Sequence, residues 1–105
     1  MVKLRHLELL KLNGVKKTFD VAEEIANSYD KIGGELLQDL NGNRVGNILK
    51  DNYYKTVDAS VDILKEWLQG SGDRPVTWRT LIRVLKKYGK VELAQDIRNA
   101  LLYMH

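Results

Sequence analysis

The sequence contains no cysteine and one proline, and its two histidines, His6 and His105, lie at opposite ends of its 105 residues. Without cysteine, disulfides, thiol chemistry and cysteine-based zinc sites are excluded. No apolar run approaches the ~18 residues that a membrane-spanning helix needs. Charged residues interrupt positions 1–12, which argues against a secretory signal. We therefore expect a compact chain in the cytoplasm or the nucleus, of which we favour the cytoplasm, with no metal, cofactor or membrane contact.

The residue patterns that enzymes require are also missing. A serine triad needs a histidine near a serine and a carboxylate, and both histidines are near the chain ends. The neighbouring Glu23 and Glu24 point about 100° apart on a helix, which does not suit an acid–base pair. Residues 42–46 contain two glycines, but no predicted strand precedes this segment and it does not end in the Gly-Lys-Ser/Thr of a phosphate loop. We expect no catalytic residue and no small-molecule substrate.

Apolar residues recur at helical spacing, and no alternating run is long enough for a strand. The spacing predicts an N-terminal helix over residues 2–12. Further helices are predicted over residues 18–29 and 35–40, from residue 43, between residues 56 and 70, between 77 and 89, and from residue 90. Gly33-Gly34 and Asn41-Gly42 are expected breaks, residues 69–76 with Pro75 a loop, and Gly89 a helix end. The expected caps are Thr18, Asn43, Thr56 and Thr77.

These stripes predict an all-α bundle of six helices from residue 18 onward, preceded by an extra N-terminal helix. Trp67 and Trp78 lie at helical spacing beside aliphatic residues, so we expect both in the core. Tyr53-Tyr54 lies at a predicted helix junction, where the pair can be exposed. The other expected core residues are Val21, Ile25, Val45, Ile48, Leu49, Val57, Val61, Leu64, Leu68, Leu81, Ile82, Leu85, Leu93, Ala94, Ile97 and Leu101.

The net charge of +3 is unevenly distributed along the chain. Residues 1–17 carry a net charge of +4, residues 18–73 carry −6, and residues 74–105 carry +5. Such a division of charge indicates which partners the chain attracts and what long-range electrostatic field it has, and it does not indicate the fold. It predicts separate acidic and basic surfaces.

Two charged stripes account for much of this division. Asp58, Asp62 and Glu66 recur at i, i+4 and i+8 on one predicted helix, where like charges destabilise an isolated helix. The next helix carries the basic stripe, formed by Arg79, Arg83, Lys86 and Lys87, with Arg74 and Lys90 flanking it. The two stripes can face each other within one molecule, remain solvated, or meet oppositely charged surfaces of another molecule. A contact between two different patches joins molecules head to tail, so it can continue into a ring or a helical filament.

The basic half offers an alternative function, a small helical nucleic-acid-binding domain that uses the fifth helix. Seven positive residues from Arg74 onward can attach to phosphates. Sequence readout adds side chains aimed at base edges, and the acidic middle segment repels a polyanion. We expect nucleic-acid binding to be the less favoured function.

The order of short motifs resembles the death domain, a family of the death-fold superfamily. The resemblance rests on Leu64 and Trp67 in one helix, Pro75-Val-Thr-Trp78, and two later pairs. Val45 and Ile48 resemble the paired aliphatic residues of the family's third helix. Residues 33–41 keep the leucines of its second helix and lack its tryptophan. The later pairs are Leu81 with Leu85 and, within Leu93-Ala-Gln-Asp-Ile97, Ala94 with Ile97.

The resemblance implies a non-catalytic adaptor that binds other death domains or itself, in apoptotic or innate-immune signalling. It implies a death domain over residues 18–105 and a helical extension over residues 1–17. It adds a residue of the second-helix region, Asp39, to the acidic contact candidates. The acidic candidates are then Asp39, Asp58, Asp62 and Glu66, and the basic ones Arg74, Arg79, Arg83, Lys86, Lys87 and Lys90.

Overall fold

The computed structural model describes residues 18–69 and 77–103, and within these ranges it contains helices and no strand. The expected all-α class is confirmed for this part of the chain. Some predicted features lie outside the description. They are the helix at residues 2–12, residues 70–76 of the loop together with Arg74, and the side chain of Leu101. The helices are α2 (Thr18–Ile25), the 3₁₀ helix η2 (Ala26–Ser28), α3 (Tyr29–Leu37), α4 (Asn43–Asp51), α5 (Thr56–Leu68), α6 (Trp78–Lys87) and α7 (Val91–Tyr103).

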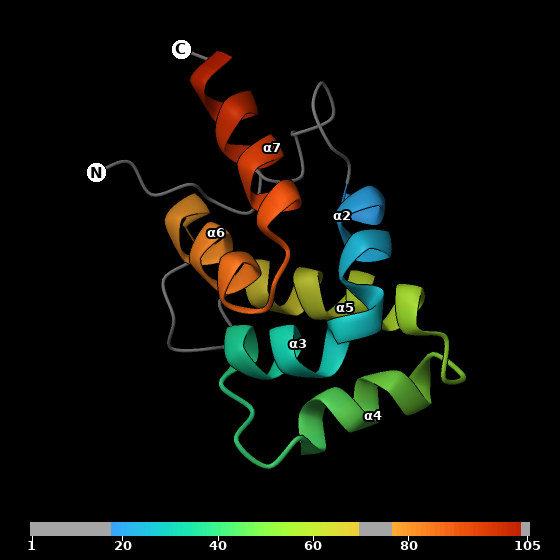
Figure 1. Cartoon of the computed structure of the whole chain (residues 1–105). Coiled ribbons are helices and arrows are strands. Elements are labelled where there is room, and N and C mark those ends of the chain that lie inside the picture. The colour runs from blue at the N-terminus through green and yellow to red at the C-terminus, as the bar shows by residue number, and fades with distance from the viewer. Residues whose placement is uncertain (1–17, 70–76, 104–105) are drawn as a thin grey trace.

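Helix α5 lies at the centre of the packing. It contacts α2, α3 and α4, while α6 packs against α3 and α7 (Figure 1). Trp67 and Trp78 are 1% and 6% exposed, so their predicted place in the core is confirmed. Leu49 and Ile82 are half-buried at its edge. The largest fully buried side chains are Trp67, Ile25, Ile32, Leu36, Ile63, Leu64, Leu81, Leu85 and Ile97.

The buried face of α5 differs from the predicted one. The spacing predicts Val57 and Val61 on this face, but both are half-buried, and Ser60 and Ile63 are fully buried instead. The hydroxyl of Ser60 donates to the carbonyl of Thr56 at 2.7 Å, which satisfies this buried polar group. Because α5 has neighbours on three sides, its buried surface is wider than one stripe, and periodicity alone does not locate its centre.

The first helical break lies at residues 26–28, where η2 joins α2 to α3 without a loop. The sequence predicts this break at Gly33-Gly34, and that prediction is wrong, since both glycines lie inside α3. The same helix ends at Leu37 rather than at Leu40. Glycine lowers helix propensity by only about 1 kcal/mol, which a favourable tertiary contact can outweigh.

Gly33 supplies such a contact, because it allows α3 to approach its neighbours closely. The residue is buried, and a Cβ atom placed on it would lie 2.8 Å from Cδ1 of Ile63 and 3.3 Å from Cγ2 of Val45. A real Cβ atom does not approach another carbon to 2.8 Å. Gly33 therefore serves the packing of α3 on α5 and α4 rather than a change of chain direction.

Left-handed residues end three of the helices. They are Gln38 after α3, Tyr53 after α4 and Gly89 after α6, with φ of 54°, 55° and 82°. In each case the N–H of the next residue donates to the carbonyl five positions earlier, at 2.9, 2.8 and 2.8 Å. This is the Schellman ending, in which glycine is the usual residue. The predicted end at Gly89 is confirmed, whereas Asn41-Gly42 precedes α4 and does not end α3.

One predicted cap is confirmed and two are wrong. The side chain of Thr77 accepts a hydrogen bond from the backbone N–H of Thr80 at 3.1 Å, which satisfies a free donor at the start of α6. Asn43 and Thr56 are instead the first helical residues of α4 and α5. The residues before them make no side-chain cap of their own. The description begins at Thr18, the first described residue of α2, so its predicted role as a cap stays a prediction.

Replacing Gly33 with alanine should destabilise the chain relative to the same change at Gly34. Both sites lie inside α3 and gain helix propensity, but the nearest atom to a Cβ at Gly34 is 3.8 Å away. Overpacking a buried site costs about 1–3 kcal/mol, so urea unfolding should rank Gly33→Ala below Gly34→Ala by about that amount. Equal stabilities would contradict the close packing of α3 on α5.

Candidate functional site

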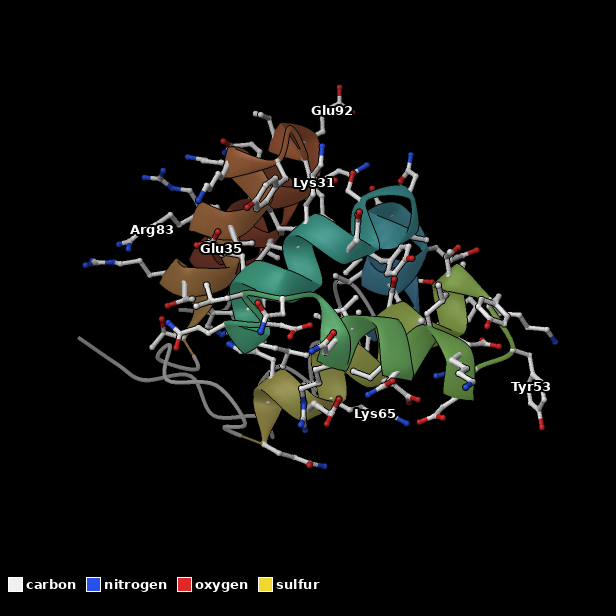
Figure 2. All side chains as sticks on the ribbon, turned by 90° about the horizontal axis from the view of Figure 1, so that it is seen from below. Lys31, Glu35, Tyr53, Lys65, Arg83 and Glu92 are labelled. Carbon is white, nitrogen blue, oxygen red and sulfur yellow. The ribbon has the colours of Figure 1, made fainter. Side chains whose placement is uncertain are left out.

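The first candidate surface is the exposed face of α6, which we call the α6 stripe: Arg79, Arg83 and Lys86. All three side chains are exposed, and none forms an ion pair or hydrogen bond with a residue that the structure describes. Figure 2 shows Arg83 at the edge of the molecule, pointing away from the helices. The opposite face fixes this orientation, because it buries Trp78, Thr80, Leu81, Val84 and Leu85.

The other basic candidates have partners within the chain. Nζ of Lys87 lies 2.8 Å from Oε1 of Glu35 on α3, and the same oxygen accepts a hydrogen bond from the hydroxyl of Tyr88 at 3.0 Å. The hydrogen bond to Glu35, and then its negative charge, raise the pKa of Lys87. Nζ of Lys90 lies 3.2 Å from Oδ1 of Asn27. These two lysines tie the end of α6 to α3 and η2.

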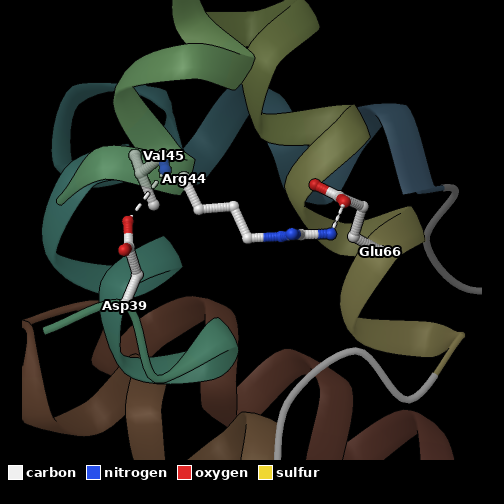
Figure 3. A network of polar contacts seen from close by, with 4 residues as sticks. All are labelled: Asp39, Arg44, Val45 and Glu66. Atoms are coloured by element: carbon white, nitrogen blue, oxygen red, sulfur yellow. Dashed lines mark hydrogen bonds and ion pairs between the residues drawn. The ribbon is translucent and has the colours of Figure 1, made fainter.

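The acidic candidates on α5 do not form one free stripe. Asp62 accepts a hydrogen bond from the side-chain amide of Asn52 at 2.8 Å, and Glu66 forms an ion pair with Arg44 of α4 (Figure 3). Asp58 is exposed and has no partner among the described residues. Two of the three carboxylates on α5 therefore contact α4 or the turn that follows it.

Asp39 has a structural contact that the sequence-based interpretation missed. Its Oδ2 accepts a hydrogen bond from the backbone N–H of Val45 at 2.8 Å (Figure 3). This N–H is one of the donors at the start of α4 that lack a partner within the helix. The carboxylate thus caps α4 from six residues away, where sequence patterns place caps immediately before the helix. Its role as a contact residue stays a prediction.

The two charged stripes do not neutralise each other within the described residues. No ion pair there joins Asp58, Asp62 or Glu66 to the α6 stripe. Helix α3 contacts both α5 and α6, and it contributes Glu35 to the end of α6. Arg74 lies outside the description. The sequence allows three arrangements of the two stripes. One of them, neutralisation of each stripe by the other, is therefore not observed in the part of the chain described.

Two tyrosines form a second exposed feature. Tyr53 and Tyr54, between α4 and α5, are 84% and 68% exposed, as their place at a helix junction suggested.

Among the residues described, no group of histidine, cysteine, aspartate and glutamate side chains could hold a metal ion. No helix in these ranges has both the length and the apolar character needed to cross a bilayer.

None of three comparisons, with protein-family models, with curated proteins and with solved structures, returns a match for this chain.

Replacing Glu35 with glutamine should lower the pKa of Lys87 towards its ordinary value of 10.5, because both causes that raise it most come from Glu35. A raised folded-state pKa contributes stability that is present below 10.5 and lost as pH rises through the raised value. The stability difference between the wild type and Glu35→Gln should therefore disappear as the pH rises from 10.5 through the raised pKa of Lys87. Carbon-13 NMR titration of the Lys87 side chain measures the shift. An unchanged pKa would contradict the pairing, and Glu92→Gln is the control.

Replacing Asp39 with alanine should cost about 1 kcal/mol, the usual effect of losing a helix cap. Asp39→Asn keeps an acceptor oxygen and should retain most of this stability. Asp58→Ala, at an exposed site without a described partner, should change stability by less than about 0.5 kcal/mol. Urea denaturation measures all three variants. A loss for Asp58→Ala as large as that for Asp39→Ala would contradict this distinction.

Proposed function

We propose that this chain is a non-catalytic protein–protein interaction domain of death-fold type, a six-helix bundle that acts in the cytoplasm. In this proposal it docks onto other death domains or onto further copies of itself. The setting that the resemblance implies is apoptotic or innate-immune signalling. The observation that carries the proposal is the α6 stripe, three exposed cations with no ion partner among the described residues.

The α6 stripe has an unfavourable charge arrangement when the molecule is alone. Arg79 and Arg83 are four residues apart and Lys86 follows three later, so like charges are neighbours on one face. Such pairs destabilise a helix by about 0.2–0.5 kcal/mol each. A complementary acidic surface would remove this repulsion, accelerate the encounter and select against basic partners. The stripe therefore favours a charged partner over plain solvation.

The burial pattern supports the death-fold part of the proposal. The residues that carry the resemblance in α5, α6 and α7 are all buried, which is what a shared core would require. Their spacing thus reflects packing as well as sequence pattern. These residues are Leu64, Trp67, Trp78, Leu81, Leu85, Leu93, Ala94 and Ile97.

Nucleic acid is the less favoured partner, because few cations of the basic half are free to contact phosphates. Among the described positive residues of this half, Lys87 and Lys90 contact Glu35 and Asn27, which leaves the α6 stripe and Arg98. Four phosphate contacts give a salt slope of only about −4. Such a slope corresponds to weak, non-specific attachment.

Charge reversal at Arg83 tests the proposal. The immobilised chain is exposed to purified death domains, to itself and to a short DNA duplex, at low and moderate salt. We expect binding to at least one protein, weakened about tenfold or more by Arg83→Glu, and weakened also by salt. Lys31→Glu makes the same charge change at an exposed site on α3 and should bind like the wild type.

Circular dichroism and thermal melting verify that each variant is folded. The proposal would be contradicted if Arg83→Glu and Lys31→Glu bound the same proteins equally well. Binding to the duplex alone, or to none of the proteins, would contradict it too.

A further inference from the structure

A groove lies between two walls, the end of α2 with η2 and the start of α7 with the turn before it, and we call it the α2–α7 groove. It has a volume of about 600 Å³ and is lined by Glu23, Glu24, Asn27, Lys90, Val91 and Glu92 among others. The ammonium group of Lys90 donates a hydrogen bond to the side-chain oxygen of Asn27 at 3.2 Å, which bridges the two walls. The α6 stripe contributes no residue to this groove.

The α2–α7 groove is acidic, even when the cations near it are counted. Residues 18–31 carry four carboxylates and one lysine, a net charge of −3. Residues 86–98 carry four cations and two carboxylates, but Lys87 is already paired with Glu35 of α3, so that segment contributes +1. The two walls and their flanks therefore retain a net charge of −2. Such a surface attracts a basic segment.

Two of the carboxylates in the groove can bind such a segment. Glu23 and Glu92 are exposed, and neither has a partner among the described residues. Figure 2 shows Glu92 at the edge of the molecule, extending beyond the helices. Because Glu23 and Glu92 lie on opposite walls, one bound segment can contact both of them.

The same two helices also expose apolar side chains. Phe19 lies four residues before Glu23, so the two side chains share one face of α2. Val91 directly precedes Glu92 and lines the groove itself. Phe19 and Val91 are 50% and 54% exposed, in contrast to the buried aliphatic residues of the core. Each helix therefore presents an exposed carboxylate together with an exposed apolar side chain.

Residues 1–17, which precede α2, have the complementary composition. They contain five basic side chains and one acidic side chain, a net charge of +4, together with five leucines. The basic side chains can pair with carboxylates of the groove, while the leucines cover the exposed parts of Phe19 and Val91. Basic residues and leucines are interspersed between Lys3 and Leu12, so a short stretch can make both kinds of contact.

The segment is also long enough to reach the groove. Along α2, which rises about 1.5 Å per residue, Glu23 lies ~8 Å from Thr18. An extended chain spans about 3.3–3.6 Å per residue, so Lys11 can lie up to ~23 Å from Thr18. Lys11 and the residues before it can therefore double back along α2 and contact either wall.

We propose that residues 1–17 bind the α2–α7 groove of their own chain, with their basic side chains on Glu23 and Glu92. This contact is independent of the proposed function, which uses the α6 stripe. Because the segment belongs to the same chain, the contact does not cost the translational freedom that a separate partner would lose. The bound segment offsets the negative charge of the groove and thereby prevents other basic surfaces from docking there.

A spin label on residues 1–17 tests this contact in the full chain. Since the sequence has no cysteine, His6→Cys provides a single attachment site, 12 residues before Thr18. The label broadens the NMR signals of amide groups that lie close to it in space. At low salt we expect signal loss at residues 89–93, which are distant from residue 6 in the sequence. At moderate salt these signals should recover, because the charges are screened.

Charge reversal identifies the carboxylates involved. Combining Glu23→Lys with Glu92→Lys in the labelled chain should restore the signals of residues 89–93. Asp51→Lys makes the same kind of charge change at an exposed residue of α4, on the side of the molecule away from α7 (Figure 1), and should leave the signal loss unchanged. Circular dichroism verifies that each variant is folded.

A mixed sample separates contacts within a chain from contacts between chains. Isotope-labelled chain without a spin label is mixed with spin-labelled chain without isotopes, and we expect no signal loss. Signal loss in this mixture would overturn the assignment to the chain's own segment. Signals at residues 89–93 that stay intact in the labelled chain, or that are lost equally in the doubly reversed variant, would overturn the contact itself. Partner binding that does not depend on Arg83, with the signal loss retained, would contradict only the proposed function.

Discussion

Helix α5 is enclosed by three neighbours, and this packing determines where the remaining helices can lie. Its fully buried residues Ile63, Leu64 and Trp67 contribute to the core that α2, α3 and α4 close. The close approach of α3 depends on Gly33, which faces Ile63 without a side chain of its own. Helix α3 in turn contacts α6, and α6 must bury Leu81 and Leu85. The outward direction of the α6 stripe is thus a consequence of the core.

The charged side chains then divide into two groups. Glu35 with Lys87 and Glu66 with Arg44 join helices that are already packed together. Such exposed pairs contribute little stability, usually about 0–1 kcal/mol, so they specify geometry more than they hold the fold. The second group, the three cations of the α6 stripe, has no partner among the described residues. The field of these unpaired charges acts outside the molecule, where it can guide association.

Much of this arrangement could be predicted from the sequence, because helical periodicity and the Thr77 cap are local signals. The helices, the two buried tryptophans and the end at Gly89 depend on residues within a few positions. Contacts between distant residues could not be predicted. Gly33 was assigned to a helix break because its packing partner is 30 positions away, and Arg44 pairs with Glu66 across 22 positions. The cap from Asp39 was missed because its carboxylate reaches α4 over an intervening turn.

We propose that this chain meets its partner through the α6 stripe. Two-dimensional NMR of the amide groups, during titration at low salt with a purified death domain or with more of the chain itself, tests this proposal most directly. We expect shifts at residues 79–86 that disappear when salt is added. Constant positions at this segment, with or without changes on another face such as α2, would contradict the proposal.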